Sequence, residues 1–179
     1  MSWMRYALID TALGTFGLAW TAKGVARVAL PGNDSRKTEM WISRDPAEPG
    51  FPNGVLADLP DRIRRYAEGE QIAFTNVPLD LSEIPDFNVA CYGELLKLGY
   101  GETTTYGAIA RTLGDVALSR AVGQAMGANP IPLIIPCHRV LAADGRTGGF
   151  SSPGGVEAKM RMLALEHAAS PTGQYAFGF

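Results

Sequence analysis

The sequence has few of the residues that build metal centres or disulfide frameworks. Among 179 residues there are only 2 cysteines and 2 histidines: Cys91, Cys137, His138 and His167. Two cysteines cannot form the set of bridges that holds a small secreted scaffold together. With so few imidazoles and thiols we expect no metal site, no metal cofactor and two reduced cysteines.

Long apolar stretches are also missing. No segment reaches the roughly 18 consecutive apolar residues that a membrane span needs. The first residues, Met1 to Arg5, do not resemble the apolar core of a secretory signal. The composition is otherwise that of an ordinary globular protein. We therefore expect no membrane partner and a cytoplasmic location.

An excess of positive charge is absent too. The chain has 16 Lys and Arg against 18 Asp and Glu, a formal net charge of −2 and a pI near 5.7. A nucleic-acid-binding domain is usually basic, so the total argues against such a partner. The charges are uneven, however: residues 1–90 carry nine basic and twelve acidic side chains, and residues 101–162 carry six and four. Any affinity for DNA should therefore be modest, salt-sensitive and located in the second half.

The most informative stretch that is present runs from Asn129 to Val140. Its three prolines forbid a regular helix and favour extended backbone. The apolar residues between them should be buried, so the segment should deliver Cys137 to the edge of a cavity. A free cysteine is most often a small buried hydrophobe. The imidazole and guanidinium that follow argue instead for a reactive thiol.

The first half of the chain predicts a small antiparallel sheet with one helix. Short strands are expected over residues 6–10, 15–20 and 24–30, because glycine-containing turns separate runs of apolar residues. Residues 31–53 predict an irregular surface loop, residues 55–67 a helix and residues 75–81 a last strand. We expect this scaffold to form a domain over residues 1–84.

The second half, residues 85–179, predicts a mostly helical domain. Helices are expected over residues 87–98, 106–113, 116–128 and 156–169, with Thr105 capping the second of them. Helix, short glycine-containing turn and helix make a helix-turn-helix pattern, which many core helix pairs share. Cys91 lies on the first of these helices and should serve packing. The predicted fold class is α+β, with the helical part forming a winged helix-turn-helix-like domain.

The helix expected over residues 116–128 is unusually thin. Most of its residues are alanine, glycine or serine, and Arg120 is the one long side chain in its middle. Small residues let core helices approach closely, and Arg120 could be an ordinary surface arginine. A DNA minor groove is only about 6 Å wide and a helix with side chains about 10–12 Å across, so only such a thin helix could lie against a widened groove.

A glycine-rich loop follows over residues 145–155. No Lys-Ser/Thr pair follows the glycines, so a nucleotide-binding loop is excluded. The loop more plausibly forms the wall of a pocket, offering backbone groups and the hydroxyl of Ser151.

Together these segments resemble a known family. Pro136-Cys137-His138-Arg139-Val140, preceded by Asn129-Pro130, resembles the active-site signature of the O6-alkylguanine-DNA alkyltransferases, the methylated-DNA–protein-cysteine methyltransferases. Further matching blocks lie at residues 101–107, 120–123, 148–150 and 163–166. The resemblance covers most of the chain after about Pro85 and is loose before it. The chain departs from the family in a longer loop after the cysteine, with Ser-Ser-Pro where one serine is usual, and in lacking a proline near Asp115.

The resemblance implies the chemistry. An alkyl group on guanine O6, or on thymine O4, would pass to Cys137 in a single turnover without a cofactor, leaving S-alkylcysteine and restored base. His138, held by Glu166, would take the thiol proton, and Tyr106 would protonate the leaving guanine at N3. Pairing with this imidazole should lower the thiol pKa. Asn129 should tie the helix-turn-helix to the cysteine segment, and Arg139 should anchor it by an ion pair.

The resemblance also implies the partner and the pocket. The partner would be double-stranded DNA containing alkylated guanine, bound through its minor groove by a monomeric protein. Arg120 would fill the gap left by the flipped base. The neighbouring helix residues expected at the DNA are Ser119, Ala121 and Gly123, together with Tyr106. The residues expected to line the base pocket are Val140, Gly148, Phe150 and Ser151.

Three other functions fit the sequence less well. A lesion-binding relative would flip alkylguanine without transfer, but such proteins lack the cysteine that Cys137 supplies. A plain helix-turn-helix regulator would not need the Pro-Cys-His-Arg segment. A thiol hydrolase is disfavoured because the only other histidine, His167, stands beside Glu166 near the end of the chain.

Overall fold

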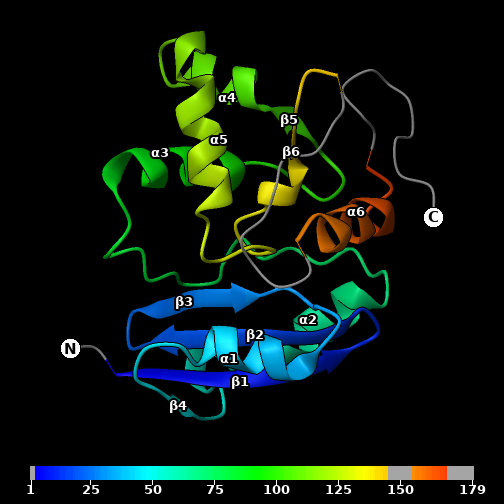
Figure 1. Ribbon diagram of the computed structural model, residues 1–179. Coiled ribbons are helices and arrows are strands. Elements are labelled where there is room, and N and C mark those ends of the chain that lie inside the picture. Colours follow the sequence, from blue (N-terminus) through cyan, green and yellow to red (C-terminus); the bar gives the residue numbers. More distant parts are fainter. Residues whose placement is uncertain (1–2, 145–154, 169–179) are drawn as a thin grey trace. The chain divides into compact units, whose positions relative to one another are not determined.

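The computed structural model describes residues 3–144 and 155–168. They form two compact units (Figure 1). The first contains the described residues up to Glu83 together with Pro130–Ile134, and the second contains Ile84–Asn129 and the described residues from Ile135 onward. The sequence-based domains 1–84 and 85–179 stay a prediction; the contacts of the chain assign Pro130–Ile134 to the first unit.

The first unit is built on a four-stranded sheet. Its strands are β1 (Met4–Thr11), β2 (Gly14–Thr21), β3 (Gly24–Ala29) and β4 (Ala47–Pro49), in the order β3-β2-β1-β4. β1 pairs antiparallel with β2, and β2 with β3, which confirms the predicted meander. The added strand β4 runs parallel to β1.

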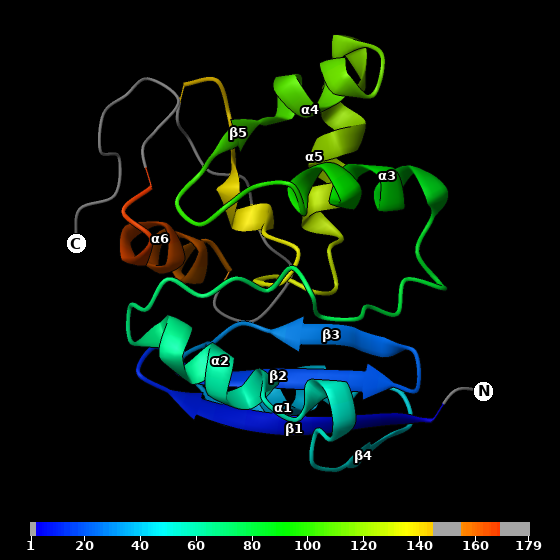
Figure 2. The same cartoon turned by 180° about the vertical axis from the view of Figure 1, so that it is seen from behind.

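Two helices cover this sheet, α1 (Ser35–Ile42) and α2 (Leu59–Ala67), and Figures 1 and 2 show them on opposite faces. The prediction of an irregular loop over residues 31–53 was wrong where α1 lies. Asp34 caps α1 by accepting a hydrogen bond from the Arg36 amide at 2.9 Å. Only Thr38 and Ile42 of α1 are buried. Because so few of its residues are buried, α1 lacks the repeating pattern of apolar residues by which helices are predicted from sequence.

The rest of the first unit differs from expectation in detail. The helix predicted over residues 55–67 begins at Leu59, with Pro60 in its first turn, after a 3₁₀ turn η1 (Gly54–Leu56). The strand predicted over residues 75–81 was wrong: only Leu79 forms a bridge, to Val25. The Pro78 carbonyl accepts a hydrogen bond from the Val25 amide at 2.9 Å. Proline has no backbone N–H to donate, which limits the hydrogen bonds that this segment can form with a neighbouring strand.

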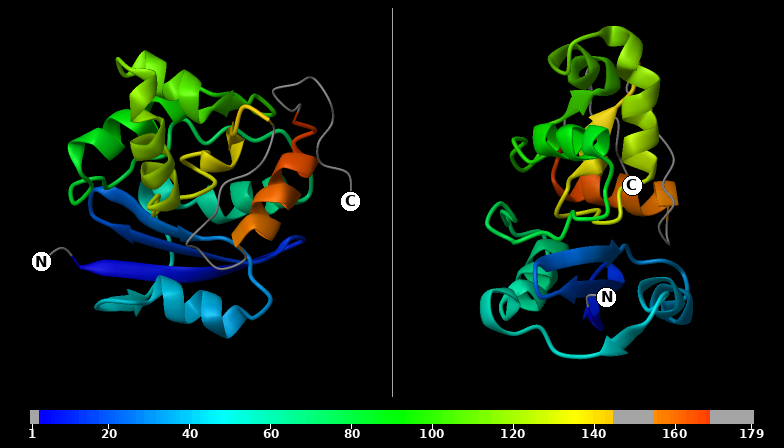
Figure 3. Two further views of the ribbon diagram at one scale, coloured as in Figure 1. Left: turned by 45° about the horizontal axis from the view of Figure 1, so that its top comes forward. Right: turned by 90° about the vertical axis from the view of Figure 1, so that its left-hand side faces the viewer.

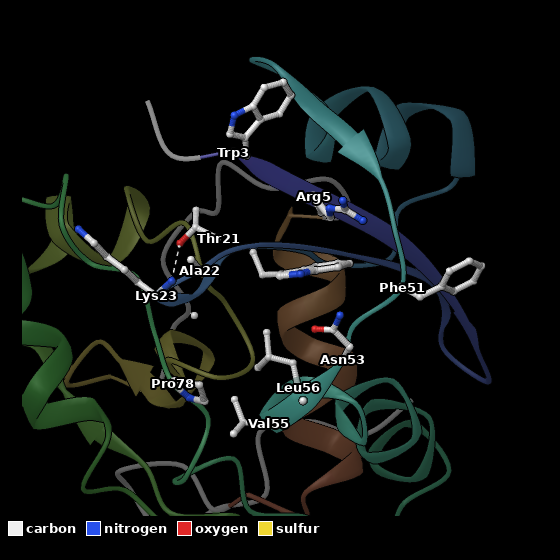
Figure 4. A pocket seen from close by; sticks show the side chains of 13 residues that line it. Trp3, Arg5, Thr21, Ala22, Lys23, Phe51, Asn53, Val55, Leu56 and Pro78 are labelled. Atoms are coloured by element: carbon white, nitrogen blue, oxygen red, sulfur yellow. Dashed lines mark hydrogen bonds between the residues drawn. The ribbon is translucent and has the colours of Figure 1, made fainter.

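The first unit also contains an open hollow of about 670 Å³ (Figure 4). Aromatic and apolar side chains line it together with the cationic side chains of Arg5 and Lys23. None of the residues predicted for the active site lines this hollow. The predicted active-site residues that the structure describes all belong to the second unit.

The second unit is mostly helical (Figure 3). Its helices are α3 (Asp86–Leu95), α4 (Tyr106–Thr112), α5 (Ser119–Gly127) and α6 (Gly155–Leu165), with 3₁₀ turns η2 (Val116–Leu118) and η3 (Cys137–Arg139). Two short strands, β5 (Thr104–Thr105) and β6 (Val140–Leu141), pair in parallel. The predicted cap is confirmed, because Thr105 Oγ1 accepts from the Ala108 amide at 3.1 Å.

The predicted helices are present, with shifted ends. The helix expected over 116–128 begins as the 3₁₀ turn η2 and becomes α-helical at Ser119. α3 ends at Leu95 and α6 at Leu165, each earlier than predicted. Sheet and helices together confirm the α+β class. Within the described residues no helix is long and apolar enough to cross a membrane.

Candidate active site

The cysteine segment is buried from Ile131 onward, but it is not extended. Every residue from Ile131 to Leu141 is buried, as predicted. The chain turns at Leu133, whose φ of +77° is unusual for a branched side chain. It turns again at η3, where the Arg139 amide donates to the Pro136 carbonyl at 3.0 Å. The prediction of extended backbone was therefore wrong at Cys137 and His138, because these residues belong to a 3₁₀ turn.

His138 and Glu166 form the core of the site. His138 Nε2 lies 2.5 Å from Glu166 Oε2, and both side chains are essentially inaccessible to solvent. The predicted contact between them is therefore confirmed. Burial lowers the pKa of His138, although the neighbouring Glu166 carboxylate acts in the opposite direction. We therefore assign a neutral imidazole that donates its Nε2 proton to Glu166.

That tautomer leaves Nδ1 as the basic nitrogen of His138. Nδ1 is buried and has no hydrogen-bond partner among the described residues. A neutral imidazole has one donor and one acceptor nitrogen, so Nδ1 carries a lone pair. The ring is therefore oriented by Glu166 on one side and able to accept a proton on the other.

The second carboxylate oxygen of Glu166, Oε1, also accepts hydrogen bonds. Arg139 Nε donates to Glu166 Oε1 at 2.8 Å, and the Gly101 amide donates to the same oxygen at 3.1 Å. The ion pair predicted for Arg139 is thus confirmed, with Glu166 as its partner. Because the guanidinium balances the carboxylate, His138 does not have to become cationic to keep Glu166 buried.

Cys137 is a protonated thiol in this arrangement. Burial raises the pKa of Cys137 to about 11, against the opposing effects of a hydrogen bond with Asn129 and of the charge on Lys159. The prediction that the adjacent imidazole lowers this pKa was wrong for the resting protein. Burial of the sulfur disfavours the thiolate because it removes the solvent that would stabilise the negative charge. The neutral imidazole beside it carries no positive charge that could offset this effect.

Asn129 connects the end of α5 to the cysteine turn. Its Nδ2 donates to the Ile135 carbonyl at 3.0 Å, and the side chain is 4% exposed. The predicted tie between the helix-turn-helix and the cysteine segment is confirmed by this contact. The same side chain also bonds to Cys137, so it helps to fix the position of the sulfur.

The thin helix α5 presents one polar face. Arg120 and Gln124, one turn apart, are exposed, while Val122, Ala125 and Met126 are buried. Ser119, Ala121 and Gly123 are partly buried. A Cβ placed on Gly123 would lie 3.9–4.0 Å from the ring of Tyr106. This is an ordinary van der Waals distance, so packing against α4, whose half-buried first residue is Tyr106, does not require a glycine at this position.

Of the four predicted pocket residues, only Val140 can be placed. It is buried in β6 and pairs with Thr104. Gly148, Phe150 and Ser151 lie outside the described residues. Within residues 3–144 and 155–168, no group of three or more His, Cys, Asp or Glu side chains is placed to hold a metal ion.

Sequence reasoning missed two buried side chains of the site. Tyr92 on α3 donates to the Ala125 carbonyl at 2.7 Å, and burial raises its pKa to about 12. Lys159 on α6 is 1% exposed and donates from Nζ to the Val140 carbonyl at 2.9 Å. A signal for Lys159 existed, because it lies three and four positions before the apolar Met162 and Leu163 and thus on the buried face of an amphipathic helix.

A buried thiol next to an imidazole that a carboxylate orients is the arrangement expected in a protein with a cysteine nucleophile. A family model described as the DNA binding domain of 6-O-methylguanine DNA methyltransferase matches residues 83–168. The chain belongs to the family of methylated-DNA–protein-cysteine methyltransferases. It is 45% identical over 166 residues to the member from Haemophilus influenzae, covering 93% of this chain and 88% of that one.

Other relatives agree with this assignment. The methylated-DNA–protein-cysteine methyltransferase of Mycobacterium tuberculosis is 33% identical over 168 residues, covering 94% of this chain and 95% of that one. The solved structure of Mycobacterium tuberculosis OGT in complex with DNA has a TM-score of 0.74 at 31% identity, covering 97% and 99% of the two chains. The likeness therefore extends over the first unit, where the sequence motifs are weak.

Proposed function

We propose that this protein repairs alkylated DNA by direct reversal, transferring the alkyl group of O6-alkylguanine, or of O4-alkylthymine, to Cys137. One observation carries the proposal: a buried thiol is followed by an imidazole that Glu166 orients at 2.5 Å, in a chain of the methylated-DNA–protein-cysteine methyltransferase family. A lesion-binding protein without transfer is not favoured, because it would have no use for a nucleophile.

The transfer is a displacement at the alkyl carbon. Cys137 Sγ forms a bond to this carbon as the bond from carbon to guanine O6 breaks, and its electron pair returns to the base. The thiol proton passes to His138 Nδ1, directly or through a water molecule, while Nε2 stays bonded to Glu166. Tyr106 gives a proton to N3 of the departing guanine, so that the base leaves in its neutral form. The Tyr106 phenolate then takes up a proton from solvent, and the His138 imidazolium releases the thiol proton to solvent, so that both side chains end neutral.

The same proposal covers the DNA partner. α5 would lie in the minor groove of double-stranded DNA containing alkylated guanine, with Arg120 in the place of the flipped base and Ser119, Ala121 and Gly123 close to the backbone. One chain carries all these residues, which supports action as a monomer. A cytoplasmic location with access to chromosomal DNA would keep the thiol reduced.

The first test is stoichiometry. A thioether is stable, and the mechanism includes no group that cleaves it, so transfer should stop at one equivalent. With excess O6-methylguanine duplex, demethylated product should reach a plateau equal to the protein concentration, and mass spectrometry should find one methyl group on Cys137. Continued turnover beyond that plateau, or no methylation at all, would contradict the proposal.

Arg120→Ala should separate base flipping from chemistry. Extruding a base costs a few kcal/mol, so the rate on duplex DNA should fall by roughly ten- to a hundredfold, while reaction with free O6-benzylguanine stays nearly unchanged. Rate constants on the two substrates are compared with those of Arg64→Ala, which removes an exposed arginine of α2. Equal losses on both substrates would mean that Arg120 supports the fold or the pocket instead.

A further inference from the structure

The buried lysine of α6 is not needed for the proposed relay, yet it lies beside it. Lysine is almost never fully buried unless its charge is compensated. Lys159 is 1% exposed, and its Nζ donates to the Val140 carbonyl at 2.9 Å. Val140 directly follows the η3 turn that contains Cys137. The ammonium is therefore fixed to the same piece of backbone as the sulfur.

The other titratable groups around the thiol are neutral or mutually balanced. From α3, burial raises the pKa of both Cys91 and Tyr92, which keeps them neutral at physiological pH. From η3, burial lowers the pKa of His138, so the imidazole is neutral too. Arg139 and Glu166 form an ion pair at 2.8 Å. Among the described residues, the charged side chain that acts directly on Cys137 is Lys159.

We propose that Lys159 is a positioning residue for the nucleophile's charge: its ammonium, held by the Val140 carbonyl, stabilises the thiolate of Cys137 while the alkyl group is transferred. This inference rests on the function proposed above. The Val140 carbonyl fixes the position of the ammonium, and the charge of the ammonium acts on the Cys137 sulfur. An opposite charge nearby favours the ionised form, and burial strengthens the attraction.

The proton balance of the transfer does not change. The thiol proton still goes to His138 Nδ1, the bond from sulfur to carbon still forms as the bond to O6 breaks, and Lys159 keeps its proton throughout. His138 thus removes the proton, and Lys159 makes the resulting negative charge tolerable in a buried site. The two residues should therefore affect the rate in different ways across pH.

The lysine charge has a limited pH range. Burial lowers the pKa of Lys159 to about 8, against the opposing effect of Cys137. The ammonium is present below this pH and is lost as the pH rises through it. The wild-type transfer rate should therefore decline above about pH 8, although hydroxide would by itself favour a thiolate. A variant without the lysine should show no such decline.

The test compares Lys159→Met, Lys159→Arg and Arg161→Met, the last of which removes a partly exposed cation of the same helix. The rate of Cys137 modification is followed by peptide mass mapping from pH 6 to 10, with methylated duplex and separately with iodoacetamide. Lys159→Met should raise the apparent pKa of the Cys137 thiol by about one unit. It should also slow transfer about tenfold at neutral pH. Lys159→Arg should recover part of the rate, and Arg161→Met should match wild type.

A purely structural role is excluded by two further readouts. Lys159→Met should not have a lower melting temperature than wild type, because it removes a charge that is costly to bury. In Lys159→Ala, added ethylammonium should restore part of the rate by occupying the space of the deleted side chain. A wild-type pH profile in Lys159→Met, or a rate loss that merely follows a loss of folded protein, would overturn the inference. Failure of wild type to accept a methyl group from DNA would instead overturn the proposed function, while the iodoacetamide titration still tests Lys159.

Discussion

Cys137→Ala is expected to abolish transfer from O6-methylguanine DNA completely and to leave DNA affinity nearly unchanged. The substitution removes the only atom that bonds to the alkyl group. It alters one buried side chain of η3, which is 2% exposed, and it leaves the exposed face of α5 intact. Methyl transfer followed by mass spectrometry and duplex binding followed by fluorescence anisotropy measure the two effects separately.

The other cysteine provides the matched control. Cys91 is also buried and also a free thiol, but it lies on α3. Burial raises the pKa of the Cys91 thiol, and Cys91 is not part of the relay described above. Cys91→Ala should therefore keep the transfer rate of wild type, and a methyl group found on Cys91 in the Cys137→Ala protein would contradict the assignment of the nucleophile.

Glu166→Ala should produce the largest loss of stability. It removes the carboxylate that accepts from His138, Arg139 and the Gly101 amide. The Arg139 guanidinium, whose side chain is 8% exposed, would lose its ion-pair partner in the interior. Breaking a buried pair from one side costs about 3–5 kcal/mol. Urea unfolding should show this loss, and the transfer rate at neutral pH should fall because His138 is no longer oriented.

Glu94→Ala is the comparison for this experiment. Glu94 pairs with Lys97 at 2.7 Å on the surface of the second unit, where the lysine side chain is 70% exposed. A surface pair of this kind contributes roughly 0–1 kcal/mol. If the two alanine variants unfold at similar urea concentrations, Glu166 is not the buried anchor inferred here.

Lys159 and Glu166 illustrate opposite uses of a buried charge. Glu166 is balanced by Arg139 and stabilises the fold, whereas the lowered pKa of Lys159 means that burying its ammonium opposes folding. The stability cost of Lys159 is present at pH values below about 8 and disappears as the pH rises towards the value of 10.5 for free lysine. A residue that costs stability and still contacts the reactive segment is more readily explained by chemistry than by packing.

Local sequence was enough for the cysteine segment and for much of the second unit. The prolines around Ile131 exclude a helix, Thr105 has the chemistry of a helix cap, and the adjacency of Cys137 and His138 indicates a reactive thiol. These signals depend on backbone sterics and on side-chain chemistry within a few residues, so they can be recognised without a fold. The resemblance carried by the Pro-Cys-His-Arg-Val segment then predicted the family correctly.

Weak local signals explain the errors in the first unit. α1 buries only Thr38 and Ile42, so its sequence appears irregular. Residues 75–81 have strand-like composition, yet Pro78 restricts their pairing. In both cases the structure is decided by contacts with distant strands, and periodicity in the sequence does not report such contacts.

By itself, the sequence determined the α+β class, because the pattern of its elements depends on local spacing. Through its resemblance to the family it also predicted a relay of Cys137, His138 and Glu166, of which the contact between His138 and Glu166 is present. Tertiary structure alone decided the electrostatics of the site. In the folded chain Cys137 and His138 lie in a 3₁₀ turn, and burial raises the pKa of the Cys137 thiol to about 11. Folding also brings Lys159 to the Val140 carbonyl. These properties depend on which groups exclude water and which charges face one another, and residues far apart in the chain meet only when it folds.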